Sequence, residues 1–291
     1  MEKSVNIDDL KITPYQKLKK LPTQLDLDAK KPRIEEELNK TCKELSAIQN
    51  KLYAHGKYSV LVCIQGMDTS GKDSLIREVF RDFNISGINC YSFKKPTLLE
   101  LGQDFLWRHY RSLPARGKFA VFNRSHYENV LISRVRPEIV LNENLPHIHK
   151  KEQITEVFWK KRLNQINHFE QIINENGTII FKFFLNISKE EQKERLIRRL
   201  DKPHKNWKFT PEDIEERKRW PDYINAYEKA INATSKNHSP WYNIPADDKH
   251  TARYLVAKVL KERIATYTDI KYPESKLKHS IDYYRDQLKN E

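Results

Sequence analysis

Five short apolar runs are distributed along the chain, and stretches with helical periodicity separate them. The runs are rich in β-branched and aromatic residues and cover residues 58–65, 88–93, 119–123, 178–185 and 241–245. Such runs are typical of strands buried in a parallel sheet. Apolar residues at helical spacing predict helices over 34–52, 98–113 and 152–175. Because alternating strands and helices favour right-handed βαβ crossovers, we predict an α/β fold with a central parallel five-stranded sheet and helices on both faces.

The two ends of the chain differ from this alternating pattern. The first 32 residues are polar and punctuated by prolines, which predicts an arm lying over the surface. The helix that follows should end at Gly56, because glycine readily adopts the left-handed conformation that closes helices. We therefore expect one domain over residues 1–291, with an N-terminal arm and helix over 1–55 and C-terminal helices over 250–291.

The charge balance narrows the classes of partner. Lysine and arginine outnumber acidic residues by 53 to 40, so the formal net charge is +13. Such an excess attracts polyanions, which include nucleic acids, acidic membrane surfaces and long inorganic phosphate chains. No apolar run approaches the roughly 20 residues of a membrane span, and the start of the chain lacks a signal-peptide arrangement. We therefore expect a cytoplasmic location, with reduced, packed thiols at Cys42, Cys63 and Cys90.

Residues 66–74 form the most informative motif of the chain. They read Gly-Met-Asp-Thr-Ser-Gly-Lys-Asp-Ser and lie between a predicted strand and a predicted helix. This fits the phosphate-binding pattern G-x-x-x-x-G-K, in which backbone N–H groups, a helix N-terminus and a lysine converge on phosphate oxygens. The motif predicts phosphoryl transfer. The residues that we expect to bind phosphate here are Gly66, Thr69, Ser70, Gly71, Lys72, Asp73 and Ser74.

The position of the metal ligand departs from the usual loop. Asp73 stands where a serine or threonine hydroxyl would ordinarily hold Mg²⁺. A carboxylate among phosphate-binding amides would repel the anion unless a divalent cation lay between them, so Asp68 is the candidate metal ligand. The alternative is that Asp68 only shapes the turn.

A second group of polar residues follows the third predicted strand. Asn123 stands where many enzymes with this loop carry an acid, so it could orient a metal-bound water or a phosphate but could not neutralise Mg²⁺. Arg124 can bind phosphate oxygens in a bidentate manner; alternatively, it pairs with Glu128 to cap the next helix. For His126 we favour a structural role, because phosphoryl transfer needs no histidine base.

Residues 195–220 are crowded with cations and are called the lid segment below. Arg198, Arg199, Lys205 and Lys208 are interleaved with Trp207 and Phe209, and two prolines bracket a loop. A helix, a basic loop and a helix in this order predict a lid that closes over a phosphorylated substrate and excludes water. A solvated charged face and a nucleic-acid groove are the alternatives.

The end of the second predicted strand offers further candidates. Lys94 could bind phosphate, and Phe93 could contact either a base or the core. Asp104 lies on the helix that follows, where substrate binding or plain packing could explain it.

Four motifs in one order carry a family resemblance. They are Gly-Met-Asp-Thr-Ser-Gly-Lys-Asp at 66–73, Phe-Lys-Lys-Pro-Thr at 93–97, Asp-Phe-Leu-Trp-Arg at 104–108 and Phe-Asn-Arg-Ser-His-Tyr-Glu at 122–128. Over about residues 30–265 the chain resembles the polyphosphate kinase 2 family. The resemblance implies a P-loop kinase fold similar to thymidylate kinase, with a helical lid. The implied activity is reversible phosphoryl transfer between inorganic polyphosphate and nucleotides.

The resemblance also implies roles for individual residues. Asp68 would hold Mg²⁺, for which Mn²⁺ could substitute, while Lys72 and Arg124 would hold the phosphates in transit. The lid cations, chiefly Arg198, Arg199, Lys205 and Lys208, would bind polyphosphate or nucleotide phosphates. Asn123 in place of the acid, followed by Glu128, looks like the subgroup called class III, whose members accept both AMP and ADP. Residues Phe93, Asp104 and Glu128 are the expected nucleotide contacts.

We therefore predict Mg²⁺-dependent conversion of AMP to ADP, of ADP to ATP and of GDP to GTP with polyphosphate as donor. The first alternative is a nucleotide kinase that uses ATP as donor, which the loop alone would permit. The second is a nucleic-acid-binding protein with a degenerate loop, suggested by the charge and the tryptophan in the lid segment. The expected partners are polyphosphate, adenine or guanine nucleotides and further copies of the chain, without nucleic acid or membrane.

Overall fold

The computed structural model describes residues 5–277 and 279–291 and contains a six-stranded sheet. Five strands run parallel to one another, as predicted, in the order β6-β5-β2-β4-β3. Their bounds are β2 Ser59–Gly66, β3 Ile88–Ser92, β4 Phe119–Asn123, β5 Thr178–Asn186 and β6 Trp241–Pro245. The sheet order puts β2 at the centre between β4 and β5, so the phosphate motif that follows β2 begins in the middle of the carboxyl edge.

The sixth strand was not predicted. β1 (Lys11–Ile12) pairs antiparallel with β6 at the edge of the sheet, so the sheet is mixed rather than purely parallel. It belongs to the N-terminal segment, where Ile7, Leu10 and Leu18 are also buried. The prediction of an arm that only lies over the surface was therefore wrong: this segment contributes to the core. The cause is the length of the strand, because two residues are too few to show an alternating pattern.

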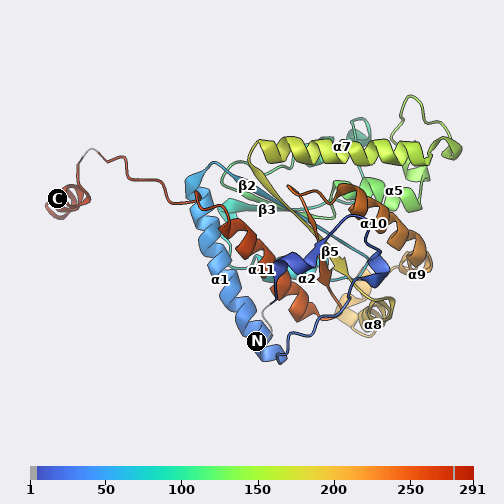
Figure 1. Ribbon diagram of the computed structural model, residues 1–291, viewed down its shortest axis with the longest axis horizontal. Helices are drawn as coiled ribbons and strands as arrows, with labels where there is room; N and C mark the ends of the chain where they lie inside the picture. The colour runs from blue at the N-terminus through green and yellow to red at the C-terminus, as the bar shows by residue number, and fades with distance from the viewer. Residues whose placement is uncertain (1–4, 278) are drawn as a thin grey trace.

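Helices cover both faces of the sheet, as predicted (Figure 1). On one face lie α1 (Lys31–His55), α2 (Lys72–Val79) and α11 (Lys249–Ala265), whose apolar residues join Val60, Val62 and Ile64 of β2 in one core cluster. On the other face α7 (Glu156–Glu175) packs Phe169 and Ile173 against Leu61 and Cys63 of the same strand. The alternation along β2 follows from the two-residue period of a strand.

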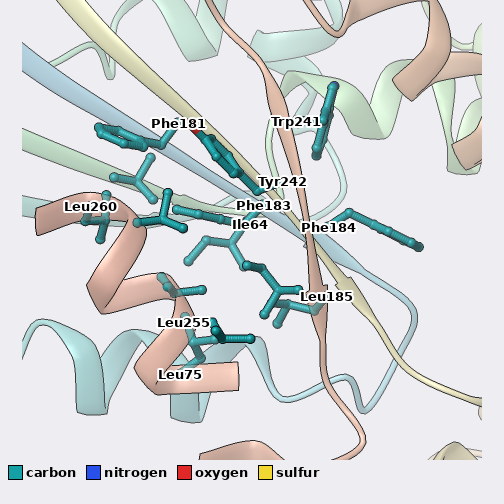
Figure 2. Packing of buried hydrophobic residues seen from close by; sticks show 14 of the residues in the cluster. Ile64, Leu75, Phe181, Phe183, Phe184, Leu185, Trp241, Tyr242, Leu255 and Leu260 are labelled. Carbon is teal, nitrogen blue, oxygen red and sulfur yellow. The ribbon is translucent and has the colours of Figure 1, made fainter. Parts of the chain in front are cut away.

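The main core lies between the sheet and α11 (Figure 2). Phe181 and Phe183 of β5 and Tyr242 of β6 lie close to Leu255 and Leu260 of the helix (Figure 2). α1 packs on the outer side of α11 and ends as predicted, with Gly56 at a φ of 66° and its N–H bonded to the carbonyl of Leu52. The core therefore holds β2 and its following helix in a fixed position.

Several local predictions were wrong in detail. The single helix expected over 98–113 is two short helices, α3 (Leu98–Leu101) and α4 (Trp107–Tyr110), separated by a turn after Gly102. Cys90 is exposed because β3 is the edge strand, whereas Cys42 and Cys63 are buried as expected. The predicted boundary at residue 152 moves to Glu156, where α7 begins.

The remaining helices complete the fold, and several of them contribute buried residues to the main core. They are η1 Ile7–Leu10, η2 Leu18–Lys20, η3 Ile85–Gly87, η4 His126–Val130, η5 Lys151–Gln153, η6 Pro203–Lys208, α5 Ile132–Val135, α6 Glu138–Leu141, α8 Lys189–Leu200, α9 Glu212–Lys218, α10 Trp220–Thr234 and α12 Ile281–Lys289. An extended arm carries α12 away from the body of the molecule (Figure 1). Within the described residues, no helix is both long and apolar enough to cross a membrane.

Candidate functional site

A cleft of about 640 Å³ opens at the carboxyl ends of β2, β3 and β4. It is bordered by the loop after β2, by the segments that follow β3 and β4, and by α9 of the lid segment. The residues of these parts that line it include Gly66, Met67, Asp68, Lys72, Phe93, Lys94, Asp104, Arg108, Arg124, Glu128, Asp213, Glu216 and Arg217. The fold thus brings together the groups predicted from three separate sequence motifs.

The conformation of the phosphate loop requires both of its glycines. A Cβ at Gly66 would lie 2.7 Å from Oγ of Ser70 and 2.8 Å from the carbonyl oxygen of Leu185, so no larger residue fits. Gly71 has a φ of 98° and forms the N-cap of α2. That conformation is costly for a residue with a Cβ. The loop therefore turns sharply from the strand into the helix N-terminus, where backbone N–H groups favour an anion.

Lys72 lies inside this loop. Its Nζ donates hydrogen bonds to the carbonyl oxygens of Gly66 at 2.8 Å and of Met67 at 3.1 Å. Burial lowers the pKa of this ammonium, and the nearby Asp68 carboxylate only partly offsets the effect. A phosphate that enters the loop would therefore meet a cation whose charged form it stabilises.

Asp68 presents a carboxylate oxygen without a hydrogen bond. Its Oδ2 is buried and makes none, and the guanidinium of Arg199 lies 3.6 Å away. In the described part of the chain, no three histidine, cysteine or acidic side chains are grouped as a metal site. A single carboxylate, here ion-paired with Arg199, fits Mg²⁺, which commonly binds one or two carboxylates together with water and substrate phosphates.

Asn123 lies at the end of β4 but contacts the loop helix instead of the cleft. Its Nδ2 donates a hydrogen bond of 2.7 Å to Oδ1 of Asp73, and the side chain is not among those that line the cleft. The pair connects the carboxyl end of β4 to the first turn of α2. This bond uses one N–H of the Asn123 amide and leaves its Oδ1, the atom that could accept from a metal-bound water, outside the pair.

Arg124 follows in a left-handed conformation. Its φ is 58°, and its backbone N–H donates to the carbonyl of Ile64. Its side chain lines the cleft together with Glu128, but among the described residues no ion pair joins the two. The helix-capping alternative requires an ion pair between Arg124 and Glu128, which this part of the structure does not show. The guanidinium of Arg124 therefore remains available to a phosphate.

A buried charged network supports the segment that carries Arg124 and Glu128. Glu170 of α7 accepts hydrogen bonds from the Tyr127 hydroxyl at 2.7 Å and from Nζ of Lys182 at 2.6 Å, and it lies 3.1 Å from Nε2 of His126. Burial alone would raise the pKa of Glu170, but Lys182 and His126 outweigh it and lower the pKa to about 2. His126 thus has the structural surroundings that we predicted.

Glu170 and Lys182 were missed by the sequence reasoning. The available signal was Lys182 itself, a single charge in the run Thr-Ile-Ile-Phe-Lys-Phe-Phe-Leu. A charged side chain in a buried strand requires a partner, and the partner lies on the helix that covers this face of the sheet.

Of the four cations predicted in the lid segment to bind phosphate, Arg199 is the one that forms an ion pair with the described part of the loop. Nη1 of Arg199 lies between the carboxylates of Asp68 and Asp213, at 3.6 and 3.1 Å. Arg198 is exposed and pairs with Glu191. Lys205 and Lys208 are exposed on η6 and do not line the cleft. In this conformation, the basic loop of the lid segment therefore faces solvent.

The predicted phosphate ligand Lys94 and the predicted nucleotide contacts Phe93 and Asp104 differ in their exposure. Phe93 packs in the second core cluster, with its ring centroid 4.2 Å from that of His109, and it also borders the cleft. Lys94 and Asp104 are exposed on the cleft wall, and Oδ1 of Asp104 accepts the backbone N–H of Leu106. For Phe93, packing is thus the main contact, whereas the other two side chains remain accessible.

Comparison with known families identifies the group to which this site belongs. The sequence model of the family described as Polyphosphate kinase 2 matches residues 28–271, which is most of the chain. The chain belongs to the polyphosphate kinase 2 family.

Two relatives within this family match over most of their length. An ADP-polyphosphate phosphotransferase of Rhodopseudomonas palustris is 46% identical over 259 residues, covering 89% of this chain and 88% of the relative. An AMP/ADP-polyphosphate phosphotransferase of Meiothermus ruber is 42% identical over 232 residues, covering 80% and 81%.

The fold agrees with a crystal structure from the same family. Polyphosphate kinase 2 from Arthrobacter aurescens superposes with a TM-score of 0.88 at 32% identity, covering 98% of this chain and 96% of that one. The predicted P-loop kinase fold is thereby confirmed.

Proposed function

We propose that the chain catalyses reversible phosphoryl transfer between inorganic polyphosphate and nucleotides. The observation that carries the proposal is the cleft in which Lys72, Arg124 and a buried oxygen of Asp68 without a hydrogen bond are brought to one phosphate loop. The names of the two relatives support the choice of polyphosphate as donor.

The residues of the cleft would act by positioning and charge stabilisation. In-line attack by a nucleotide phosphate oxygen needs no strong general base, because that oxygen is already anionic. Lys72 and the loop amides would hold one phosphate and Arg124 another, on either side of the group in transit. Asp68 would hold Mg²⁺, or Mn²⁺ in its place, which when bound would neutralise charge on the phosphates. Closure of the lid segment would exclude water as a competing acceptor.

The proposed acceptors are nucleoside mono- and diphosphates. We propose AMP, ADP and GDP as acceptors, in keeping with the relative named for both AMP and ADP. Glu128 and Asp104 both line the cleft, where they would contact the nucleotide, and Lys94, which also lines it, would bind phosphate. We also propose a cytoplasmic location, without nucleic acid or membrane as a partner. We further propose that the chain forms a homo-oligomer, whose subunit number light scattering would measure.

A donor comparison tests the function directly. With AMP or GDP as acceptor and Mg²⁺ present, we expect polyphosphate to give the next higher phosphate and ATP to be a much poorer donor, and with ADP as acceptor we expect polyphosphate to give ATP. The reverse preference would indicate an ATP-dependent nucleotide kinase. If folded protein transferred no phosphate from polyphosphate, and bound a nucleic acid that polyphosphate failed to displace, the proposal would be wrong.

Substitution of the candidate metal ligand tests the site. Asp68→Asn should lower the transfer rate by about 100-fold or more, as loss of a main electrostatic group at a reaction centre does, and should weaken stabilisation by Mg²⁺ or Mn²⁺ in a thermal melt with tripolyphosphate present. Asp9→Asn, an exposed residue of η1, is the matched control and should change neither. An unaltered metal response in Asp68→Asn would favour the alternative that Asp68 only shapes the turn.

A further inference from the structure

Three successive carbonyl groups of the phosphate loop are bonded to side chains of α8. Nε2 of Gln192 donates to the carbonyl of Asp68 at 3.1 Å. Nη1 of Arg195 donates to the carbonyls of Thr69 and Ser70, each at 3.1 Å. These bonds fix three consecutive peptide units, and they satisfy carbonyl oxygens whose partial charge would otherwise repel a phosphate.

The middle residue of the three has an unfavourable backbone conformation. Thr69 has a φ of 60°, in the left-handed region. For a β-branched residue this is a true outlier, because its branched Cβ crowds the backbone there. Such conformations persist only where surrounding contacts enforce them, and they are concentrated at functional sites. The side chain of Thr69 does not offset the cost of this conformation, since its Oγ1 is buried without a hydrogen-bond partner.

The two α8 side chains are themselves firmly anchored. The second terminal nitrogen of Arg195 donates to the carbonyls of Ala246 at 2.6 Å and Asp247 at 2.9 Å, just after β6, and its Nε donates to Glu191. Gln192 is 3% exposed, and its Oε1 accepts a 2.8 Å bond from Arg217 of α9. Because this bond occupies the amide oxygen, the amide nitrogen must face Asp68.

We propose that Gln192 and Arg195 are positioning residues that hold Thr69 in its left-handed conformation and so keep residues 68–70 in the phosphate-binding form. Arg195 does not line the cleft, and although Gln192 does, the bond assigned to it here is to the loop. Their contribution is to make the strained loop the ground state before phosphate arrives, so that binding does not have to supply the cost of ordering it.

The inference makes a prediction that a merely stabilising role does not. Glycine adopts positive φ without strain, so Thr69→Gly should make the loop less dependent on its anchors. Gln192→Leu should weaken binding of inorganic tripolyphosphate about fivefold in the otherwise wild-type chain, the effect of losing one hydrogen bond. In a chain that carries Thr69→Gly, the same substitution should weaken binding by a clearly smaller factor.

The experiment is a double-mutant cycle of four chains, with dissociation constants measured by calorimetry and melting temperatures recorded in parallel. Gln49→Leu is the matched control, because Gln49 is also buried and also bonds backbone, namely the carbonyl and N–H of Asn84. It should lower the melting temperature without changing tripolyphosphate binding in either background. Gln192→Glu is the second variant if Gln192→Leu fails to fold, since it keeps the volume and the acceptor for Arg217 but cannot donate to Asp68.

Two outcomes would overturn the inference. One is an equal loss of binding from the Gln192 substitution in both backgrounds. The other is a lower melting temperature with unchanged binding. The inference rests on the proposed function only for the identity of the ligand, and the binding assay requires no turnover. Absence of phosphoryl transfer with the expected binding pattern would therefore refute the function and leave the positioning role standing.

Discussion

At the scale of the single residue, Lys72 shows how burial and charge are balanced in the site. Its ammonium is surrounded by loop carbonyls and by Asp68, and burial lowers its pKa below the ordinary value. A bound phosphate stabilises the charged form, so the pKa must rise when phosphate binds. Thermodynamic linkage then requires that binding take up a proton wherever part of Lys72 is neutral in the free protein.

We therefore expect tripolyphosphate affinity to fall as the pH rises through the lowered pKa of Lys72, at pH values below the ordinary lysine pKa of about 10.4. The sign follows because a higher pH favours neutral Lys72, which binds an anion more weakly. Calorimetry in two buffers of different ionisation enthalpy measures the proton uptake. The same measurement on Lys72→Met gives the proton uptake that comes from tripolyphosphate itself, and this value is subtracted from that of the wild-type chain. Equal proton uptake by both chains would show that Lys72 does not titrate in this range.

At the scale of the element, the buried network joins α7, β5 and η4. Lys182 and Glu170 are both completely buried, and Lys182 also donates to the carbonyl of Thr234 at the end of α10. Because Tyr127 and His126 bond the same carboxylate, the network fixes the segment that follows β4. The position of Arg124 in the cleft thus depends on the Glu170–Lys182 pair, which holds the residues that follow Arg124 along the chain.

Lys182→Met should destabilise the protein by about 3–5 kcal/mol, because it leaves the charge of Glu170 buried without its partner. The double substitution Glu170→Gln with Lys182→Met should recover much of that loss, since no buried charge remains. Denaturant unfolding measures both changes. If the double variant were as unstable as the sum of the two single variants, the pair would not be coupled and the network would have to be reinterpreted.

Elements of this size also show what the sequence can and cannot predict. The five parallel strands were found because each run contains β-branched or aromatic residues and lies between helical segments, and the loop was found because its glycines and lysine have fixed spacing. β1 was not predicted because two residues are too few to show a pattern. The region 98–113 was predicted as one helix because helix propensity does not reveal the turn after Gly102.

Within the site, the prediction reached side chains but not backbone partners. Asp68, Lys72 and Arg124 were recognised as chemical groups near one loop, and the structure brings all three to the cleft. The four carbonyls that Arg195 holds belong to distant backbone segments, and the bonds depend on how those backbone atoms are oriented. No periodicity encodes such orientations, so the anchoring of the loop could be seen only in the structure.

At the scale of the whole molecule, the structure shows where part of the net charge of +13 lies. Several cations near the cleft are neutralised by partners, as Arg199 is by Asp213 and Arg198 by Glu191. Lys205 and Lys208 of η6 differ, because among the described residues neither has an ion pair and both are exposed. Uncompensated charge beside a phosphate-binding cleft attracts a long polyanion and releases its counterions.

The salt dependence of polyphosphate binding tests whether Lys205 and Lys208 attract the donor. The Michaelis constant for long polyphosphate should rise with potassium chloride, and the combined variant Lys205→Gln with Lys208→Gln should reduce the logarithmic slope by up to about 2, roughly one per lost phosphate contact. The matched control is Lys57→Gln with Lys118→Gln, which removes the same charge just before the amino ends of β2 and β4. If both double variants changed the slope equally, the general charge of the molecule, and not the lid segment, would determine attraction of the donor.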